Sequence, residues 1–202
     1  MAIAGLNNQC CTYANNLYQR TTKSSDSFMG IMSTTSEKVE KQTAGETIGF
    51  GTIIEPNSNV GWCMKAKYAE KSTPENPVVY VETNYGGETV AYNINVNDVD
   101  PGNASRLEIF ALASYADDQR IGCGSTFGTY NTLNNFETMA IHNGYFGKYV
   151  ESASTWEQFT NEKLNWEDAC RQLTDLFYNC NDLLQYKYGK GIMDMFSKYP
   201  AV

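Results

Sequence analysis

Cys123 and His142, the chain's single histidine, could act as a nucleophile and its base. Cys123 stands in a Gly-Cys-Gly-Ser run like that around a papain-type nucleophile, although Thr126 and Phe127 replace the second cysteine and the aromatic residue of that motif. Papain-type enzymes also place their histidine about 130–150 residues downstream, whereas His142 follows in the next predicted helix. The pair supports an alternative hypothesis, a small cysteine-dependent hydrolase or transferase. In the competing interpretation, His142 compensates a helix dipole and Cys123 is an ordinary thiol.

Two neighbouring carboxylates form a second candidate site. Asp117 and Asp118 end a predicted helix, where the macrodipole disfavours each negative charge by about 0.3–1 kcal/mol. This placement points to a binding contact or a metal, and a local ion pair with Arg120 is the favoured explanation. The acidic segment 98–103 resembles a calcium loop in composition only, because its glycine is displaced and Ile109 stands where the last glutamate ligand belongs. We therefore predict no metal site and no cofactor.

A polar strand face is the third candidate. Apolar and polar residues alternate over 88–97, which predicts that Asn93, Asn95 and Asn97 face away from the core. With Tyr92 on the same strand, they are predicted to bind a partner. The chain has 14 Tyr, and polar surfaces rich in tyrosine suit protein or carbohydrate contact. A protein partner or self-assembly is expected first, and a carbohydrate second.

The elements that must position these residues are predicted to be strands first and helices after. Alternation over residues 47–97 predicts an antiparallel sheet of about four strands, in which Gly49 and Gly51 mark a bulge or a close backbone approach. The clearest prediction is a hairpin over 78–96 with a glycine turn. Helical periodicity over residues 103–186 predicts about three helices, and the order of elements predicts an α+β fold.

The ends of the predicted helices follow from local signals. Asp100 or Asn103 is expected to cap the first helix. Gly189 and Gly191 are expected to break the third helix near Gln185, leaving a short final turn.

The chain is predicted to consist of one domain and a tail. Residues 47–202 form the single α+β domain, and residues 1–46 are too polar to offset their ordering entropy, which predicts a flexible or partner-ordered tail. The start of the tail has no cation before Arg20 and no apolar stretch of a secretory signal. The general secretory route is therefore not expected. In composition the tail resembles those of bacterial proteins exported without a cleaved signal, which implies non-classical export to the surface or medium, with a cytoplasmic location as the alternative.

Charge and composition exclude several classes of function. The chain has 202 residues, a formal net charge of -8 and 42% hydrophobic residues. An acidic surface disfavours nucleic acid, whose phosphates reward Lys and Arg. No apolar run approaches the ~18 residues of a spanning helix, so membrane insertion is not expected. None of the six cysteines forms a C-x-x-C spacing, which argues against zinc and thioredoxin-type motifs.

Several strings resemble a family of uncharacterised proteins of clostridial bacteria. They are Ser72-Thr-Pro-Glu-Asn-Pro-Val-Val79, Asn95-Val-Asn-Asp-Val-Asp-Pro-Gly-Asn-Ala-Ser105, Glu108-Ile-Phe-Ala-Leu112, Ser114-Tyr-Ala-Asp-Asp118 and Gly124-Ser-Thr-Phe-Gly128. The resemblance covers residues 47–180 and implies a Gram-positive bacterial host. The family has no assigned activity, so the resemblance implies no catalytic residue.

The combined prediction is a non-enzymatic interaction or structural module, exported or surface-associated, whose N-terminal tail serves export or assembly. The motivation is an acidic domain rich in Tyr and Asn in which no set of residues completes a catalytic motif.

Overall fold

The computed structural model describes residues 36–39, 45–54, 61–85, 88–146 and 160–199. Its sheet has five antiparallel strands in the order β1-β5-β4-β3-β2. The strands are β1 (Ser36–Val39), β2 (Thr47–Ile54), β3 (Gly61–Tyr68), β4 (Val78–Tyr85) and β5 (Glu88–Asn95). Strands β2 to β5 follow one another as a meander, and β1 adds a fifth strand beside β5. This strand lies within the range predicted to be a tail, whose other residues are mostly outside the described ones.

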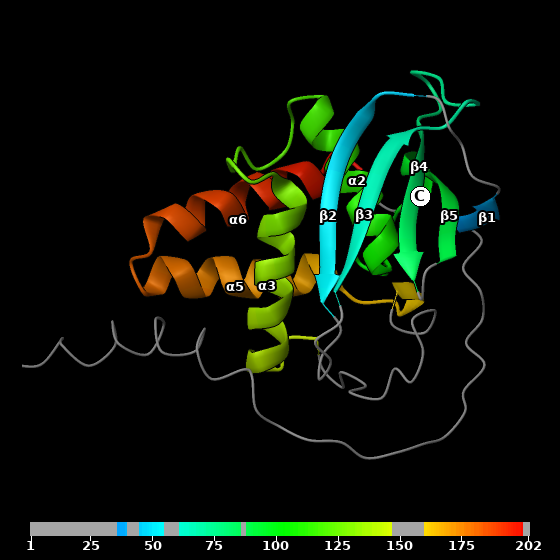
Figure 1. Cartoon of the computed structure of the whole chain (residues 1–202). Helices are drawn as coiled ribbons and strands as arrows, with labels where there is room; N and C mark the ends of the chain where they lie inside the picture. The colour runs from blue at the N-terminus through cyan, green and yellow to red at the C-terminus, as the bar shows by residue number, and fades with distance from the viewer. Residues whose placement is uncertain (1–35, 40–44, 55–60, 86–87, 147–159, 200–202) are drawn as a thin grey trace, which may run out of the picture.

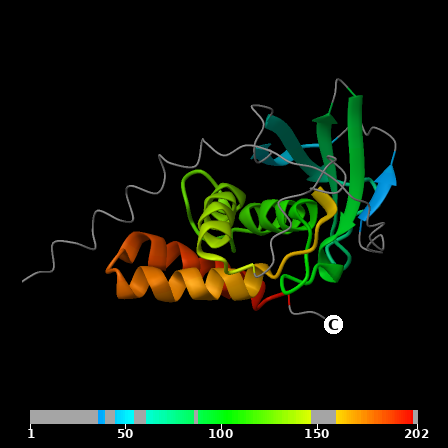
Figure 2. The same ribbon diagram turned by 90° about the horizontal axis from the view of Figure 1, so that it is seen from below.

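Four α-helices follow the sheet in the described part of the chain, so the predicted α+β class is confirmed. They are α2 (Arg106–Asp118), α3 (Thr129–Asn143), α5 (Trp166–Asn179) and α6 (Leu183–Phe196), and a short 3-10 helix, η2 (Val96–Asp98), precedes them. The helices gather on one side of the sheet, and α5 and α6 run side by side away from it (Figures 1 and 2). No helix in the described residues combines the length and the apolar character that crossing a bilayer requires.

The main core lies between one face of the sheet and α2. Val79, Val81 and Ile94 alternate with outward residues and are fully buried, as the strand pattern predicts. They meet the helix side chains of Leu107 and Phe110, which are equally buried. Helix α2 is buried along most of its length because the sheet covers one side and the other helices cover the rest. Its two ends are therefore the places where charged residues must find partners.

The glycines of β2 allow the helices to approach the sheet closely. A Cβ added at Gly49 would lie 2.2 Å from Ser114 Oγ, and one at Gly51 would lie 2.7 Å from the ring of Tyr130. The register between β2 and β3 also shifts at Thr47 and Gly49, which is a bulge. Both features predicted for these glycines are present.

The predicted break at Gly189 and Gly191 is wrong. The chain instead turns at residues 180–182, where Asn181 has a φ of 60°, and α6 then runs through both glycines. A Cβ at Gly189 would lie 2.2 Å from Thr174 Oγ1, and one at Gly191 would lie 2.8 Å from Cys123 Cα. The two residues are thus glycine because α6 packs closely against α5 and against the segment before α3. The predicted third helix is consequently two helices.

The first helix also begins later than predicted. Ser105 is its N-cap and forms a capping box with Glu108, which places the start at Arg106. Asp100 instead accepts a hydrogen bond from the Gly102 N–H, in a turn that precedes the helix.

Candidate functional site

Cys123 and His142 lie near opposite ends of α3. Cys123 is 5% exposed, and its Sγ lies 3.8 Å from Thr132 Oγ1 in the first turn of that helix. His142 is exposed in the last turn, about ten residues and so about 15 Å farther along the axis. A general base must reach its nucleophile within about 2.6–3.2 Å. The structure does not bring these two side chains together.

The asparagines of the polar strand face serve mainly local structure. Tyr92 is 6% exposed and belongs to the core, so its ring does not contribute to an open binding surface. The Asn95 side chain accepts a hydrogen bond from the Asn97 N–H and caps η2, and Asn97 Nδ2 donates to the Glu75 carbonyl. Asn93 Oδ1 is buried without a hydrogen-bond partner. These four residues do not form a continuous exposed patch.

Asp117 holds the start of α3. Its Oδ2 accepts the Thr129 N–H at 2.7 Å, and its Oδ1 accepts the Thr129 hydroxyl at 2.6 Å. The N-cap residue of α3 is Gly128, which has no side chain, so a carboxylate from the end of α2 takes over the capping role. A Cβ at Gly122 would lie 1.9 Å from Asp117 Oδ1, which explains the glycine there. The unfavourable dipole at the end of α2 is thus offset by the favourable dipole of α3.

Asp118 has a different partner, the hydroxyl of Tyr68 on β3. The Tyr68 hydroxyl donates to Asp118 Oδ2 at 2.7 Å, and Gln119 Nε2 donates both to the same carboxylate oxygen and to the Tyr68 oxygen. Burial and the hydrogen bond to Asp118 raise the pKa of Tyr68 from 10.0 to about 12. The sequence favoured a local ion pair between these carboxylates and Arg120. In the structure Asp118 instead contacts Tyr68 of β3 and Gln119.

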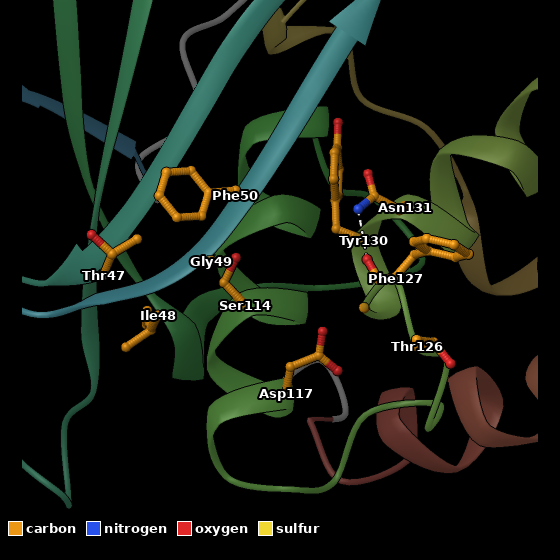
Figure 3. A pocket seen from close by; sticks show the side chains of 11 residues that line it. Thr47, Ile48, Gly49, Phe50, Ser114, Asp117, Thr126, Phe127, Tyr130 and Asn131 are labelled. Atoms are coloured by element: carbon orange, nitrogen blue, oxygen red, sulfur yellow. Dashed lines mark hydrogen bonds between the residues drawn. The ribbon is translucent and has the colours of Figure 1, made fainter.

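A cleft of about 390 Å³ opens beside Asp117, and we call it the edge cleft (Figure 3). It is lined by the first half of β2, the end of α2 and the start of α3, with residues Thr47, Ile48, Gly49, Phe50, Ser114, Asp117, Thr126, Phe127, Gly128, Tyr130 and Asn131. Phe50 is 69% exposed and Phe127 is 81% exposed. Since β2 is the last strand of the sheet, the cleft follows a strand whose other side pairs with β3.

A second cleft, of about 350 Å³, lies on another side of α2, and we call it the tyrosine cleft. It is lined by Tyr68, Ala69, Ser72, Thr73, Pro74, Pro77, Tyr115 and Gln119. The rings of Tyr68 and Tyr115 pack edge to face with centroids 6.2 Å apart. Both clefts fall within the range of about 300–1,000 Å³ that is usual for binding sites.

The start of α2 carries a buried ionic cluster instead of a cleft. Arg106 is fully buried, its Nε and Nη2 lie 2.6 Å from Glu137 Oε1, and its Nη1 lies 3.1 Å from Glu162. Glu108, also fully buried, is paired with Lys163. Burial raises the pKa of Glu137, and Arg106 opposes that effect. These ion pairs connect α2 with α3 and with the segment 160–164, so their role is to stabilise the packing of these elements.

Metal-binding chemistry finds no support in the described residues. No group of three or more His, Cys, Asp or Glu side chains there is placed to hold a metal ion. The four cysteines of this part of the chain, Cys63, Cys123, Cys170 and Cys180, are free.

Sequence reasoning missed the aromatic residues of both clefts. Phe127 did have a signal, since a large apolar residue in a glycine-rich loop has no helix or strand to bury it. Phe50 also had one, because the alternation that turns Gly49 and Gly51 toward the helices turns Phe50 outward. Tyr68 lies at the end of β3, which places its hydroxyl at the rim of the tyrosine cleft.

The chain matches no protein-family model, and comparisons with curated proteins and with solved structures found no match.

Proposed function

We propose that the protein is a non-enzymatic interaction module that binds an extended segment of a protein partner along β2. One observation carries the proposal: the two most exposed phenylalanines of the described residues lie at this edge of the sheet, Phe127 beside the cleft and Phe50 on the face of β2 that is turned away from the helices. Exposed aromatic side chains cost solvation free energy, and they are enriched at the centres of protein interfaces.

The backbone of the edge cleft supports the same function. Residues Thr47 to Phe50 line the cleft one after another, so a strand edge runs along it. An edge strand presents N–H and C=O groups that an extended segment can pair with, and side-chain pockets beside it provide selectivity. Lys65 on the neighbouring strand β3 lies with its Nζ 5.9 Å from the centre of the Phe50 ring, a cation–π contact that holds this ring against the sheet.

The polar groups of the edge cleft favour binding over catalysis. Asp117 is the carboxylate among its lining residues, and both of its oxygens accept hydrogen bonds from Thr129. The described residues that line this cleft include no histidine, cysteine, lysine or second carboxylate that could act with Asp117 as an acid–base pair. Asn131 Nδ2 likewise donates to the Phe127 carbonyl and holds the loop in place. What remains open to a ligand is mainly backbone and aromatic surface.

The experiment compares two matched double variants of the tagged full chain in its native host. Phe50→Ser with Phe127→Ser removes the two exposed phenylalanine side chains at the edge cleft, and Leu183→Ser with Leu184→Ser removes exposed apolar side chains at the start of α6. We expect the wild type and the α6 variant to recover the same partner and the cleft variant to lose it. Hydrogen exchange should then show that the partner protects the amides of residues 47–50. Equal recovery by the cleft variant, or turnover by the purified monomer, would contradict the proposal.

The predictions of export, and of a tail that serves assembly, complete this proposal. They concern residues 1–46, of which the structure describes 36–39 and 45–46. Membership of the clostridial family stays a prediction as well.

A further inference from the structure

The tyrosine cleft lies on a different side of α2 from the edge cleft. Ser114 and Asp117 face the edge cleft, whereas Tyr115 and Gln119, one helical turn apart, face the tyrosine cleft. The two clefts can therefore be occupied and mutated independently.

Hydrogen bonds in the tyrosine cleft fix the orientation of one amide. Gln119 Nε2 donates to Asp118 Oδ2 and to the Tyr68 oxygen. A carboxylate only accepts hydrogen bonds, so the nitrogen of this amide must face Asp118. Gln119 Oε1 is therefore turned away from Asp118, and within the described residues it accepts no hydrogen bond.

Two hydroxyl groups, those of Ser72 and Thr73, line the same cleft. Ser72 Oγ accepts the Val78 N–H at 2.9 Å, and Thr73 Oγ1 accepts the Asn76 N–H at 3.1 Å. Both contacts use lone pairs and leave the hydroxyl protons able to donate. The cleft thus offers one acceptor and two hydroxyl donors among its lining residues, and its apolar lining includes Tyr115, Pro74 and Pro77.

This arrangement selects among ligand classes. A sugar ring presents hydroxyl groups that both donate and accept, together with an apolar face of C–H groups that packs on an aromatic ring. A proline-rich segment would also pack on Tyr115, but proline has no N–H to donate to Gln119 Oε1. Asp118 beside Gln119 and the net charge of -8 disfavour an acidic sugar.

We propose that the tyrosine cleft binds a neutral saccharide, with Gln119 accepting from one ring hydroxyl, Ser72 and Thr73 donating to others, and Tyr115 packing on the C–H face. This site goes beyond the proposed partner-binding function and does not depend on it.

The test measures binding of defined disaccharides to the full chain by calorimetry and by saturation-transfer NMR. The probes are cellobiose, maltose, mannobiose and diacetylchitobiose, with digalacturonic acid as the acidic counterpart and a proline-rich peptide as the competing class. We expect one neutral disaccharide to bind with a Kd at or below about 1 mM, as suits a small open site. Gln119→Met and Thr73→Val should each weaken that binding by about three- to tenfold, the loss of one hydrogen bond.

The matched control is Phe127→Ala in the edge cleft, which should bind the sugar as the wild type does. Gln119 and Thr73 are exposed, so their variants are expected to fold, and thermal unfolding verifies this. Four results would overturn the proposal: no neutral disaccharide binds, the acidic one binds more tightly, the peptide binds in its place, or the Gln119 and Thr73 variants bind like the wild type. A lost sugar site would leave partner recovery through the edge cleft unchanged, so failures of the two proposals are distinguishable.

Discussion

The two ends of α2 carry similar residue types in opposite environments. At the first end, Arg106 and Glu108 are fully buried, and their charges are paired inside the protein. At the last end, Asp117 and Asp118 sit beside two open clefts and accept hydrogen bonds from uncharged groups. The difference teaches that a charged residue in this fold indicates binding only where the surrounding elements leave space. Burial separates the end whose charges are paired inside the protein from the end that lies beside the two clefts.

The largest effect on the free energy of unfolding should come from removing a buried charge at the first end of α2. Arg106→Met leaves Glu137 and Glu162 without their cation, so we expect the free energy of unfolding to fall by about 3–5 kcal/mol. Arg171→Met is the matched control, because Arg171 pairs with Glu167 and Asp168 on an exposed helix surface, and should cost less than about 1 kcal/mol. Urea denaturation measures both. Equal losses would show that the buried cluster has no special role.

A smaller effect should separate the two neighbouring carboxylates. Asp117→Ala removes the cap of α3 and should lower the free energy of unfolding by about 1–2 kcal/mol. Asp118→Ala removes contacts at an exposed rim and should change it by about 0.5 kcal/mol or less. The same denaturation experiment distinguishes them. A larger loss of stability in Asp118→Ala than in Asp117→Ala would contradict the assignment of Asp117 as the cap of α3 and of Asp118 as an exposed contact.

The smallest predicted effect is the titration of the Tyr68 hydroxyl, which lies beside the last end of α2. The pKa of Tyr68 is raised to about 12 in the folded protein and returns to about 10 on unfolding. Its contribution to stability is therefore fully present below pH 10 and is lost as the pH rises toward 12. The ultraviolet difference between wild type and Tyr68→Phe should show this ionisation near pH 12.

Asp118→Asn provides the control for that titration. It removes the negative charge that helps to raise the pKa, so the ionisation of Tyr68 should move to lower pH. An unchanged titration would mean that burial alone causes the shift.

Local patterns predicted the sheet well and the helix connections poorly. The hairpin of β4 and β5 follows from alternation and a glycine turn, which are properties of adjacent residues. The roles of Gly189 and Gly191 depend on Thr174 and Cys123, far away in the chain. A rule that treats glycine as a helix breaker cannot include such contacts, because they exist only after packing.

The candidate sites show the same limit. The unfavourable place of Asp117 and Asp118 at a helix end predicted that each needs a partner, and the structure provides partners other than the expected Arg120. Their actual partners, Thr129 and Tyr68, could not be deduced, because pairing depends on how α3 and β3 are placed against α2. Cys123 and His142 suggested a reactive pair by residue type, but helix geometry separates them.

The contact between Gly191 and Cys123 also has a consequence for synthesis in the cell. The segment between α2 and α3 carries Phe127 and shapes the edge cleft, and α6 packs directly against it. A chain emerging from the ribosome can pair β2 to β5 early, since these strands are consecutive. The edge cleft, in contrast, cannot take its final form until residues 183–196 have emerged. A nascent chain could therefore pair these strands well before the edge cleft is complete.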